Sequence, residues 1–206
     1  TFLTHSPEEA IEALVAVLTS QRGRETESAS AVPEKTFEFM GSVARLQSDS
    51  SYIWEATEYR HEAHLKMLDA FEATLSRFAD DAHLHGIFHR MISVVTKINP
   101  WAAVWRQVLA VGIRHPKTVG KSLSELAWAV PILTGLDTSQ LAGEFVRAVF
   151  AELDAGARLK IERAILSIPT TVPADKVDTA RRIRDCLLGC IPIVLATTSE
   201  AQSILT

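Results

Sequence analysis

The chain has 206 residues, of which 47% are apolar and 22% are charged, and its formal net charge is −4. This composition is ordinary for a folded globular protein and excludes a disordered or low-complexity chain. The first hundred residues carry 9 basic and 15 acidic side chains and the remainder carry 12 and 10, so neither half is basic enough for charge alone to predict nucleic-acid binding.

Cysteine usage and hydropathy give no sign of secretion or of a membrane span. The two cysteines, Cys186 and Cys190, lie in "CLLGC", and we interpret them as small, buried, reduced residues on one face of a helix. The longest apolar stretch, at 186–196, contains a proline and is far shorter than the ~20 residues that span a bilayer. No signal-peptide pattern opens the chain, and its first residue, Thr1, suggests a processed or excised part of a larger protein. We therefore expect a cytoplasmic fragment of a larger protein, with no membrane partner.

The first predicted element is an N-terminal helix over residues 1–22. Its start signal is "SPEE" (6–9), which supplies an N-cap serine, a proline at the first helical position and a glutamate that closes a capping box. A polar, serine-rich linker is predicted over 23–35. A weaker helix is predicted to follow it, from about residue 36 to residue 46.

The region 36–98 is predicted to contain a long antiparallel helical hairpin. Two apolar seams alternate steps of three and four residues, the heptad-like spacing of packed helices, and "ADDAH" (79–83) between them supplies a tight turn. The first seam comprises Trp54, Thr57, His61, His64, Leu68, Phe71, Leu75 and Phe78, and the second comprises Leu84, Phe88, Met91, Val95 and Ile98.

Shorter helices with regular breaks are predicted over 99–206. The breaks at "NP", "HP", "LDTS", "LDAG" and "VPAD" each precede a helix start. Pairing these helices gives units that begin near Pro100, Thr138 and Ala174, with spacings of 38 and 36 residues. A period of this length is typical of stacked helix pairs. The predicted fold is therefore all-α, with the long helical hairpin followed by stacked helix pairs in an α-solenoid.

The four tryptophans are expected to be mostly core residues. Trp101 and Trp105 share a predicted helix face one turn apart, and Trp128 is predicted to lie on the partner helix of the same pair. We expect these three side chains to hold that first pair together.

Three segments of the second half share one design. "HPKTVGKSLSELAWAVPIL" (115–133) combines a turn with a helix, and "GARLKIERAILSIP" (156–169) and "TARRIRDCLLGCIP" (179–192) are basic, apolar-striped helices that end in Ile-Pro. On these segments, residues 100–206 resemble a HEAT-like α-solenoid, although the Asp and Arg ladder of regular HEAT repeats is not recognisable. The pattern also looks like the helical sensor regions of large bacterial signalling or defence ATPases, where such arrays follow a nucleotide-binding domain. No phosphate-binding "GxxxxGK[ST]" occurs in these 206 residues.

Histidines supply the first candidate chemistry. "HLHGIFHR" (83–90) contains three of them and "RHEAH" (60–64) contains two. In the predicted hairpin, His64 lies roughly 15 Å along the axis from the residue opposite His85. Metal ligands must lie about 2 Å from the ion, so the two groups cannot share one metal.

Two smaller metal sites stay open. His85 and His89, four residues apart, are candidate ligands of one transition metal together with Asp81 one turn earlier. Glu58 and His61 have the ExxH spacing of ferritin-like bundles, with His64 nearby. The alternative is that the histidines bind no metal, His61 and His64 packing at the polar end of the seam and His85 and His89 lying on an exposed flank.

Basic side chains on two successive predicted helices supply the second candidate site. The partner-binding candidates are Arg158, Arg163, Arg181 and Arg184, with Lys160, Lys176 and Arg182 nearby. Such a stripe is suited to phosphate or an acidic partner. Acidic residues are interleaved with it, however, which equally predicts a solvated, salt-bridged surface.

Two functions follow from these observations. The first is a non-catalytic helical scaffold or sensor module that binds a protein partner or another domain of a larger parent chain, with no cofactor. It rests on the repeat period and on the absence of a catalytic motif such as GxSxG. The second is a metal-binding helical bundle centred on the histidines. Nucleic-acid binding is disfavoured by the net charge.

Overall fold

The computed structural model describes residues 6–25, 33–54 and 62–206. Within these ranges the chain is mostly helical and contains one two-stranded antiparallel sheet. The elements are α2 (Pro7–Glu25), β1 (Lys35–Phe39), β2 (Ser42–Leu46), α3 (Ala63–Asp80), α4 (His85–Ile98), α5 (Ala102–Arg114), α6 (Val130–Thr134), α7 (Ser139–Val149), α8 (Ala155–Ser167), α9 (Val177–Leu188) and α10 (Ser199–Leu205). Single turns of 3₁₀-helix and one π-helical turn, Pro116–Gly120, join several of them.

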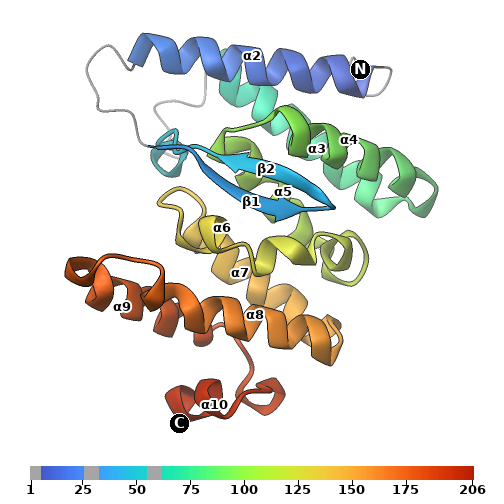
Figure 1. Cartoon of the computed structure of the whole chain (residues 1–206). Helices are drawn as coiled ribbons and strands as arrows, with labels where there is room; N and C mark the ends of the chain where they lie inside the picture. Colours follow the sequence, from blue (N-terminus) through green and yellow to red (C-terminus); the bar gives the residue numbers. More distant parts are fainter. Residues whose placement is uncertain (1–5, 26–32, 55–61) are drawn as a thin grey trace.

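The elements are stacked along one axis in nearly their order in the chain (Figure 1). Along one side, α3 contacts α5, α5 contacts α7, and α7 contacts α9. Along the other side, α4 contacts β2, β1 contacts α6, and α6 contacts α8. Helix α2 covers α3 and α4 at one end, and α10 contacts α9 at the other. The β-hairpin thus lies between α4 and α6 in the second row.

The helix predicted over 36–46 is wrong, because this segment forms the β-hairpin. Its burial alternates with period two, which is the strand pattern: Phe37, Phe39, Ala44 and Leu46 are buried and their neighbours are half-buried or exposed. The two-residue turn is Met40–Gly41, with φ of 51° and 70°. Positive φ at both central residues matches the twist of a hairpin. The "MG" in "FEFMGSVARL" was therefore the turn signal that the helical interpretation overlooked.

The predicted helical hairpin is confirmed in α3 and α4, which pack against each other. Its seams face the core: the buried members are His64, Leu68, Phe71, Leu75, Phe78, Phe88, Met91 and Val95. The first helix begins at Ala63 and not at Trp54, which follows a short 3₁₀ turn. The seam positions Thr57 and His61 lie outside the described residues.

The predicted unit starts near 100, 138 and 174 also match the starts of α5, α7 and α9 to within three residues.

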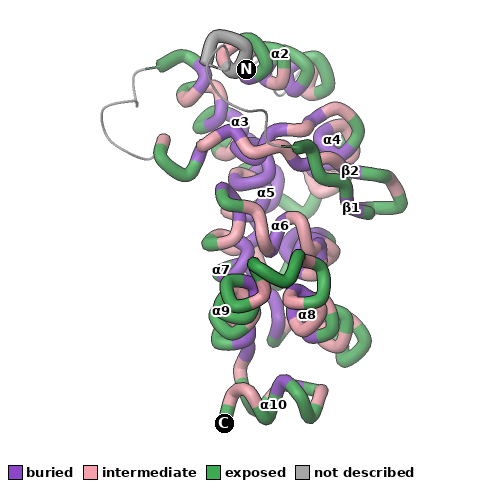
Figure 2. Tube along the Cα trace, turned by 60° about the vertical axis from the view of Figure 1, so that its left-hand side comes forward, coloured by how far each residue is buried: buried purple, intermediate pink, exposed green. Residues whose placement is uncertain are grey.

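Helix α5 is the centre of the fold, and burial in Figure 2 concentrates along it and its neighbours. Trp105 is fully buried, and its ring meets Phe37 edge-on with centroids 5.3 Å apart and Phe39 with centroids 5.7 Å apart. Its Nε1 donates to the backbone carbonyl of Arg45 at 2.9 Å. The core role predicted for Trp101 and Trp105 is confirmed. Trp128 is only half-buried and ends a 3₁₀ turn, so its predicted place on a partner helix is wrong.

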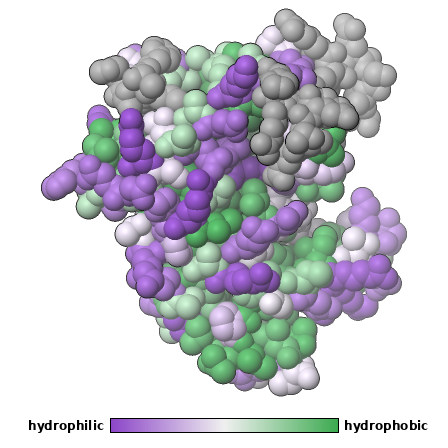
Figure 3. Space-filling model, turned by 180° about the vertical axis from the view of Figure 1, so that it is seen from behind, coloured by the Kyte–Doolittle hydropathy of each residue, from purple (hydrophilic) through white to green (hydrophobic). Residues whose placement is uncertain are grey.

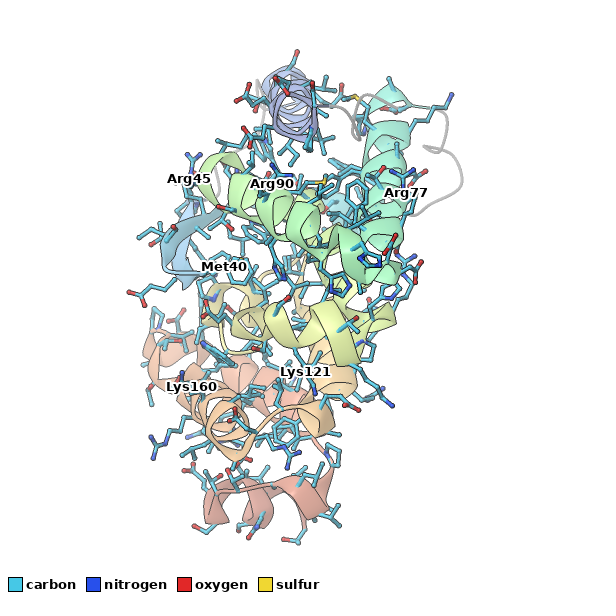
Figure 4. All side chains as sticks on the ribbon, turned by 90° about the vertical axis from the view of Figure 1, so that its right-hand side faces the viewer. Met40, Arg45, Arg77, Arg90, Lys121 and Lys160 are labelled. Atoms are coloured by element: carbon cyan, nitrogen blue, oxygen red, sulfur yellow. The ribbon has the colours of Figure 1, made fainter. Side chains whose placement is uncertain are left out.

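Two hydrogen bonds join the hairpin to neighbouring segments. At its tip, the backbone N–H of Met40 donates to Glu125 Oε2 at 2.6 Å. Near its other end, Arg45 Nη2 donates to the carbonyl of Ile98 at 3.0 Å, which links β2 to the end of α4. Both residues lie on the hairpin side of the molecule (Figure 4).

Candidate functional site

The predicted metal ligands are engaged in local contacts at the turn between α3 and α4. Asp81 Oδ1 accepts a hydrogen bond from the backbone N–H of His83 at 2.9 Å, so this carboxylate caps the short helix that follows it. His85 Nε2 lies 3.0 Å from the carbonyl oxygen of Ala79. The His89 ring packs edge-on against Phe88, with centroids 5.6 Å apart. Both His85 and His89 are half-buried, so their predicted place on an exposed flank is wrong.

The predicted three-ligand site is not assembled. Within residues 6–25, 33–54 and 62–206, no group of three or more His, Cys, Asp or Glu side chains is placed to hold a metal ion. Burial, and secondarily the charge of His85, lower the pKa of His89. His64 is buried beside Trp54, with ring centroids 5.1 Å apart, and its Nδ1 lies 3.3 Å from Glu62. Glu58 and His61 lie outside the described residues.

The predicted basic stripe lies on α8 and α9, but most of its members have intramolecular partners. Arg158 donates to the carbonyls of Phe150 at 3.0 Å and Ala151 at 2.8 Å, which caps the end of the preceding helical segment. The remaining pairs are Arg181 with Asp178 at 3.2 Å and Arg184 with Asp185 at 2.8 Å, while Arg163 is exposed on α8. Lys160 on the same helix (Figure 4) lies over the Trp128 ring, 5.1 Å from its centroid. These contacts favour the salt-bridged surface over a row of free guanidinium groups.

Two buried carboxylates, Asp49 and Asp137, lie where the hairpin meets α5 and the turn before α7. Asp49 Oδ2 accepts from the backbone N–H of Ala103 at 2.8 Å, in the first turn of α5, and its Oδ1 accepts from the N–H of Ser51 at 3.1 Å. Asp137 Oδ2 accepts from Ser48 Oγ at 2.5 Å and from the N–H of Asp49 at 3.3 Å. Its backbone carbonyl accepts from Arg106 Nη1.

Within this acidic pair, Asp49 has a perturbed pKa of the kind that is common in active sites. Burial raises the pKa of Asp49 to about 6, and the charge of Asp137 adds to the rise, against hydrogen bonds from Ser51 and Ala103 that lower it. The carboxylate oxygens of both residues, however, are directed at backbone N–H groups of the chain itself. Their arrangement joins three segments that are distant in the sequence, and we assign the pair a structural role.

The raised pKa of Asp49 predicts how stability depends on pH. The folded state holds this proton up to a pH of about 6, whereas the unfolded chain releases it near 3.8, so the folded state takes up a proton as pH falls through this window and becomes more stable. Relative to Asp49→Asn, the wild-type chain should gain up to about 3 kcal/mol of unfolding free energy between pH 7 and pH 4. Urea denaturation at several pH values measures this difference.

The exposed Asp175→Asn variant is the matched control, and its stability should follow that of the wild type across the same pH range. An Asp49→Asn variant whose difference from wild type is the same at pH 4 and at pH 7 would contradict the assignment.

A groove of about 510 Å³ lies between α7 and α9. Rows of residues four apart form its walls, as on any surface between packed helices. The α7 wall carries Ser139, Gln140, Gly143, Glu144 and Arg147, the α9 wall carries Thr179, Arg182, Ile183, Cys186 and Leu187, and Leu133 and Cys190 complete the lining. Apolar and small side chains therefore predominate, with charges at both walls. We call this feature the α7/α9 groove.

The α7/α9 groove was not predicted from the sequence. Cys186 and Cys190 are free thiols, but Cys186 is exposed and Cys190 half-buried, so their predicted burial is wrong. Gly143 lies where the two walls approach, since a Cβ there would be 3.3 Å from Cys190 Sγ. The spacing of Thr179, Ile183 and Leu187 was a possible signal of the groove, because it places one polar and two apolar side chains in a row beside the small side chain of Cys186 on one helix.

Comparison of the chain with models of protein families, with curated proteins and with solved structures finds no match. Of the helices in the described ranges, none combines the length and the hydropathy needed to cross a bilayer. The functional argument therefore rests on the chain's own geometry.

Proposed function

We propose that this chain is a non-catalytic helical scaffold or sensor module of the α-solenoid type, which binds a protein partner or another domain of a larger parent chain. The α7/α9 groove is the observation that carries this proposal. It is open, lined largely by apolar and small side chains, and bordered by charged residues, which is the make-up of surfaces that receive another helix.

The stacking of the elements supports the solenoid part of the proposal. The contacts α3 to α5, α5 to α7 and α7 to α9 are each between elements two steps apart in the array, as in stacked helix pairs. Solenoids recognise partners through the extended surface that such rows present. The β-hairpin between α4 and α6 is a departure from a regular repeat.

The test is selection of binding peptides, followed by a variant that fills the groove. Phage-displayed random peptides of about five helical turns would be panned against the intact chain, and the most enriched peptide synthesised with a fluorophore. Because Cys186 is exposed in the groove, Cys186→Trp should occupy the groove without disturbing the core. We expect it to weaken peptide binding at least tenfold.

The matched control is Ala73→Trp, which places the same side chain on an exposed position of α3, outside the groove. It should bind the peptide as tightly as the wild type does. Equal denaturation midpoints for the three chains would confirm that both variants fold. Selection that enriches no peptide, or peptides that bind Cys186→Trp and wild type equally, would overturn the proposal.

A further inference from the structure

The α7/α9 groove has the dimensions of a short helix-binding site. Its α7 wall runs from Ser139 to Arg147 and its α9 side from Thr179 to Cys190, which corresponds to roughly 12–16 Å at the helical rise. Two to three turns of a partner helix fit this length. Gly143 and Cys186 keep the walls low, so the backbone of a partner can approach closely.

The charges on the two walls define the partner further. Arg147 on α7 and Arg182 on α9 are both exposed. The guanidinium of Arg147 lies 3.7 Å from Cys190 Sγ, and within the described ranges neither arginine forms an ion pair with a carboxylate. The other two arginines of α9, by contrast, pair with aspartates one or three residues away. The acidic residue of the groove, Glu144, accepts a long contact of 3.5 Å from Gln140.

We infer that the α7/α9 groove binds an acidic amphipathic α-helix of a partner protein. This inference rests on the proposed function and names the partner's chemistry. The helix places an apolar stripe against Ile183 and Cys186, beside the already buried Leu133 and Leu187, and carries Asp or Glu on both flanks. These carboxylates pair with Arg147 on one wall and with Arg182 on the other, which fixes the orientation of the helix in the groove.

Within the described residues, the acidic helix α2 of a second copy is not free to enter the groove. Helix α2 already buries Ile11, Leu14 and Leu18 in the core and exposes Glu8 and Glu9 on the opposite face. Releasing that apolar stripe would unfold the end of the stack. A self-association that Cys186→Trp abolishes would overturn the assignment to a partner protein, and light scattering measures it.

The test uses the enriched peptide in two synthetic forms, one with Glu and one with Lys at its flanking positions, titrated by fluorescence anisotropy. We expect Arg147→Glu/Arg182→Glu to weaken the Glu-flanked peptide at least thirtyfold and to strengthen the Lys-flanked peptide. The control Arg163→Glu/Lys176→Glu makes the same change in net charge at exposed positions outside the groove, and should change both affinities less than threefold.

The outcomes separate this inference from the proposed function. If Cys186→Trp abolishes binding while the two charge-reversed chains bind both peptides alike, the groove is a docking site but its partner is not selected by acidic flanks, and the inference is overturned. If Cys186→Trp has no effect, both fail. If the wild type prefers the Glu-flanked peptide and only Arg147→Glu/Arg182→Glu prefers the Lys-flanked peptide, the inference is supported.

Discussion

Replacing Trp105 with alanine should lower the free energy of unfolding by about 4 kcal/mol, the range observed when a large buried aromatic side chain is truncated. Trp105 is fully buried at the centre of the stack and packs edge-on against Phe37 and Phe39. Its Nε1 also donates to the carbonyl of Arg45. One side chain therefore holds both strands of the hairpin against α5, and its loss removes packing, leaves a cavity and frees a carbonyl acceptor.

Two further variants divide this effect between packing and hydrogen bonding. Trp105→Phe keeps most of the ring packing but loses the donor to Arg45, and should cost about 1–2 kcal/mol. Trp128→Ala removes a half-buried ring and should cost less than Trp105→Ala. Chemical denaturation gives the three values, and hydrogen exchange of residues 35–46 should show the hairpin loosening first. A loss in Trp105→Ala no larger than that in Trp128→Ala would refute the central role of this residue.

The parts of the fold that could be predicted are those whose signals are local. Apolar spacing predicts the seams of α3 and α4, and breaks in the sequence predict the helix starts near 100, 138 and 174. Both signals lie within a few residues of the element they predict. The β-hairpin was missed although "FEFMGSVARL" carries both period-two burial and a two-residue turn. The aromatic contacts that stabilise this segment as a sheet are made by the ring of Trp105, more than sixty residues away in the sequence.

The candidate sites were less predictable, because one spacing of residues can serve several roles and because the groove is formed by residues that are distant in the sequence. Asp81, His85 and His89 have ligand spacing, but the same spacing also serves a helix cap and aromatic packing. The four arginines of the predicted stripe were predicted from their positions in the sequence alone. The orientation of Arg158, however, is set by its hydrogen bonds to the backbone carbonyls of Phe150 and Ala151. The groove needed both α7 and α9, whose wall residues Arg147 and Arg182 are separated by 35 positions. Nothing near either arginine in the sequence indicates the other.

Exposed apolar side chains and exposed acidic side chains lie toward opposite ends of the stack. Seen from behind, apolar surface gathers toward the end where α10 lies (Figure 3). Ile193 and Val194, in the turn before α10, are 44% and 87% exposed. At the opposite end, α2 presents exposed Glu8, Glu9 and Glu12. Because α10 contacts α9 at the apolar end, the hydrogen bonds that hold α10 in place also determine how much of α9 is covered.

Removing the Glu162 carboxylate should detach α10. Glu162 is fully buried on α8, and its Oε1 accepts from the backbone N–H of Thr197 at 2.6 Å and from Thr197 Oγ1 at 3.0 Å. Its Oε2 accepts from the N–H of Thr198 at 2.7 Å, and Thr198 is the N-cap of α10. A buried charge is retained only where hydrogen bonds compensate its desolvation, and here one carboxylate takes all three from the chain that leads into α10.

Glu162→Gln keeps the size of the side chain but places an amide N–H donor opposite a backbone N–H donor. Glu162→Ala leaves the backbone N–H groups of Thr197 and Thr198 without this acceptor. We expect each to cost about 3 kcal/mol of local stability, since hydrogen bonds to a charged group contribute about 1.5–3 kcal/mol. Hydrogen exchange of residues 199–205 should accelerate on the order of a hundredfold, while that of α5 stays unchanged. Glu200→Gln, an exposed change in the first turn of α10, should shift the same amides only slightly. Equal acceleration in Glu162→Gln and Glu200→Gln would mean that the macrodipole, and not the buried carboxylate, holds α10 in place.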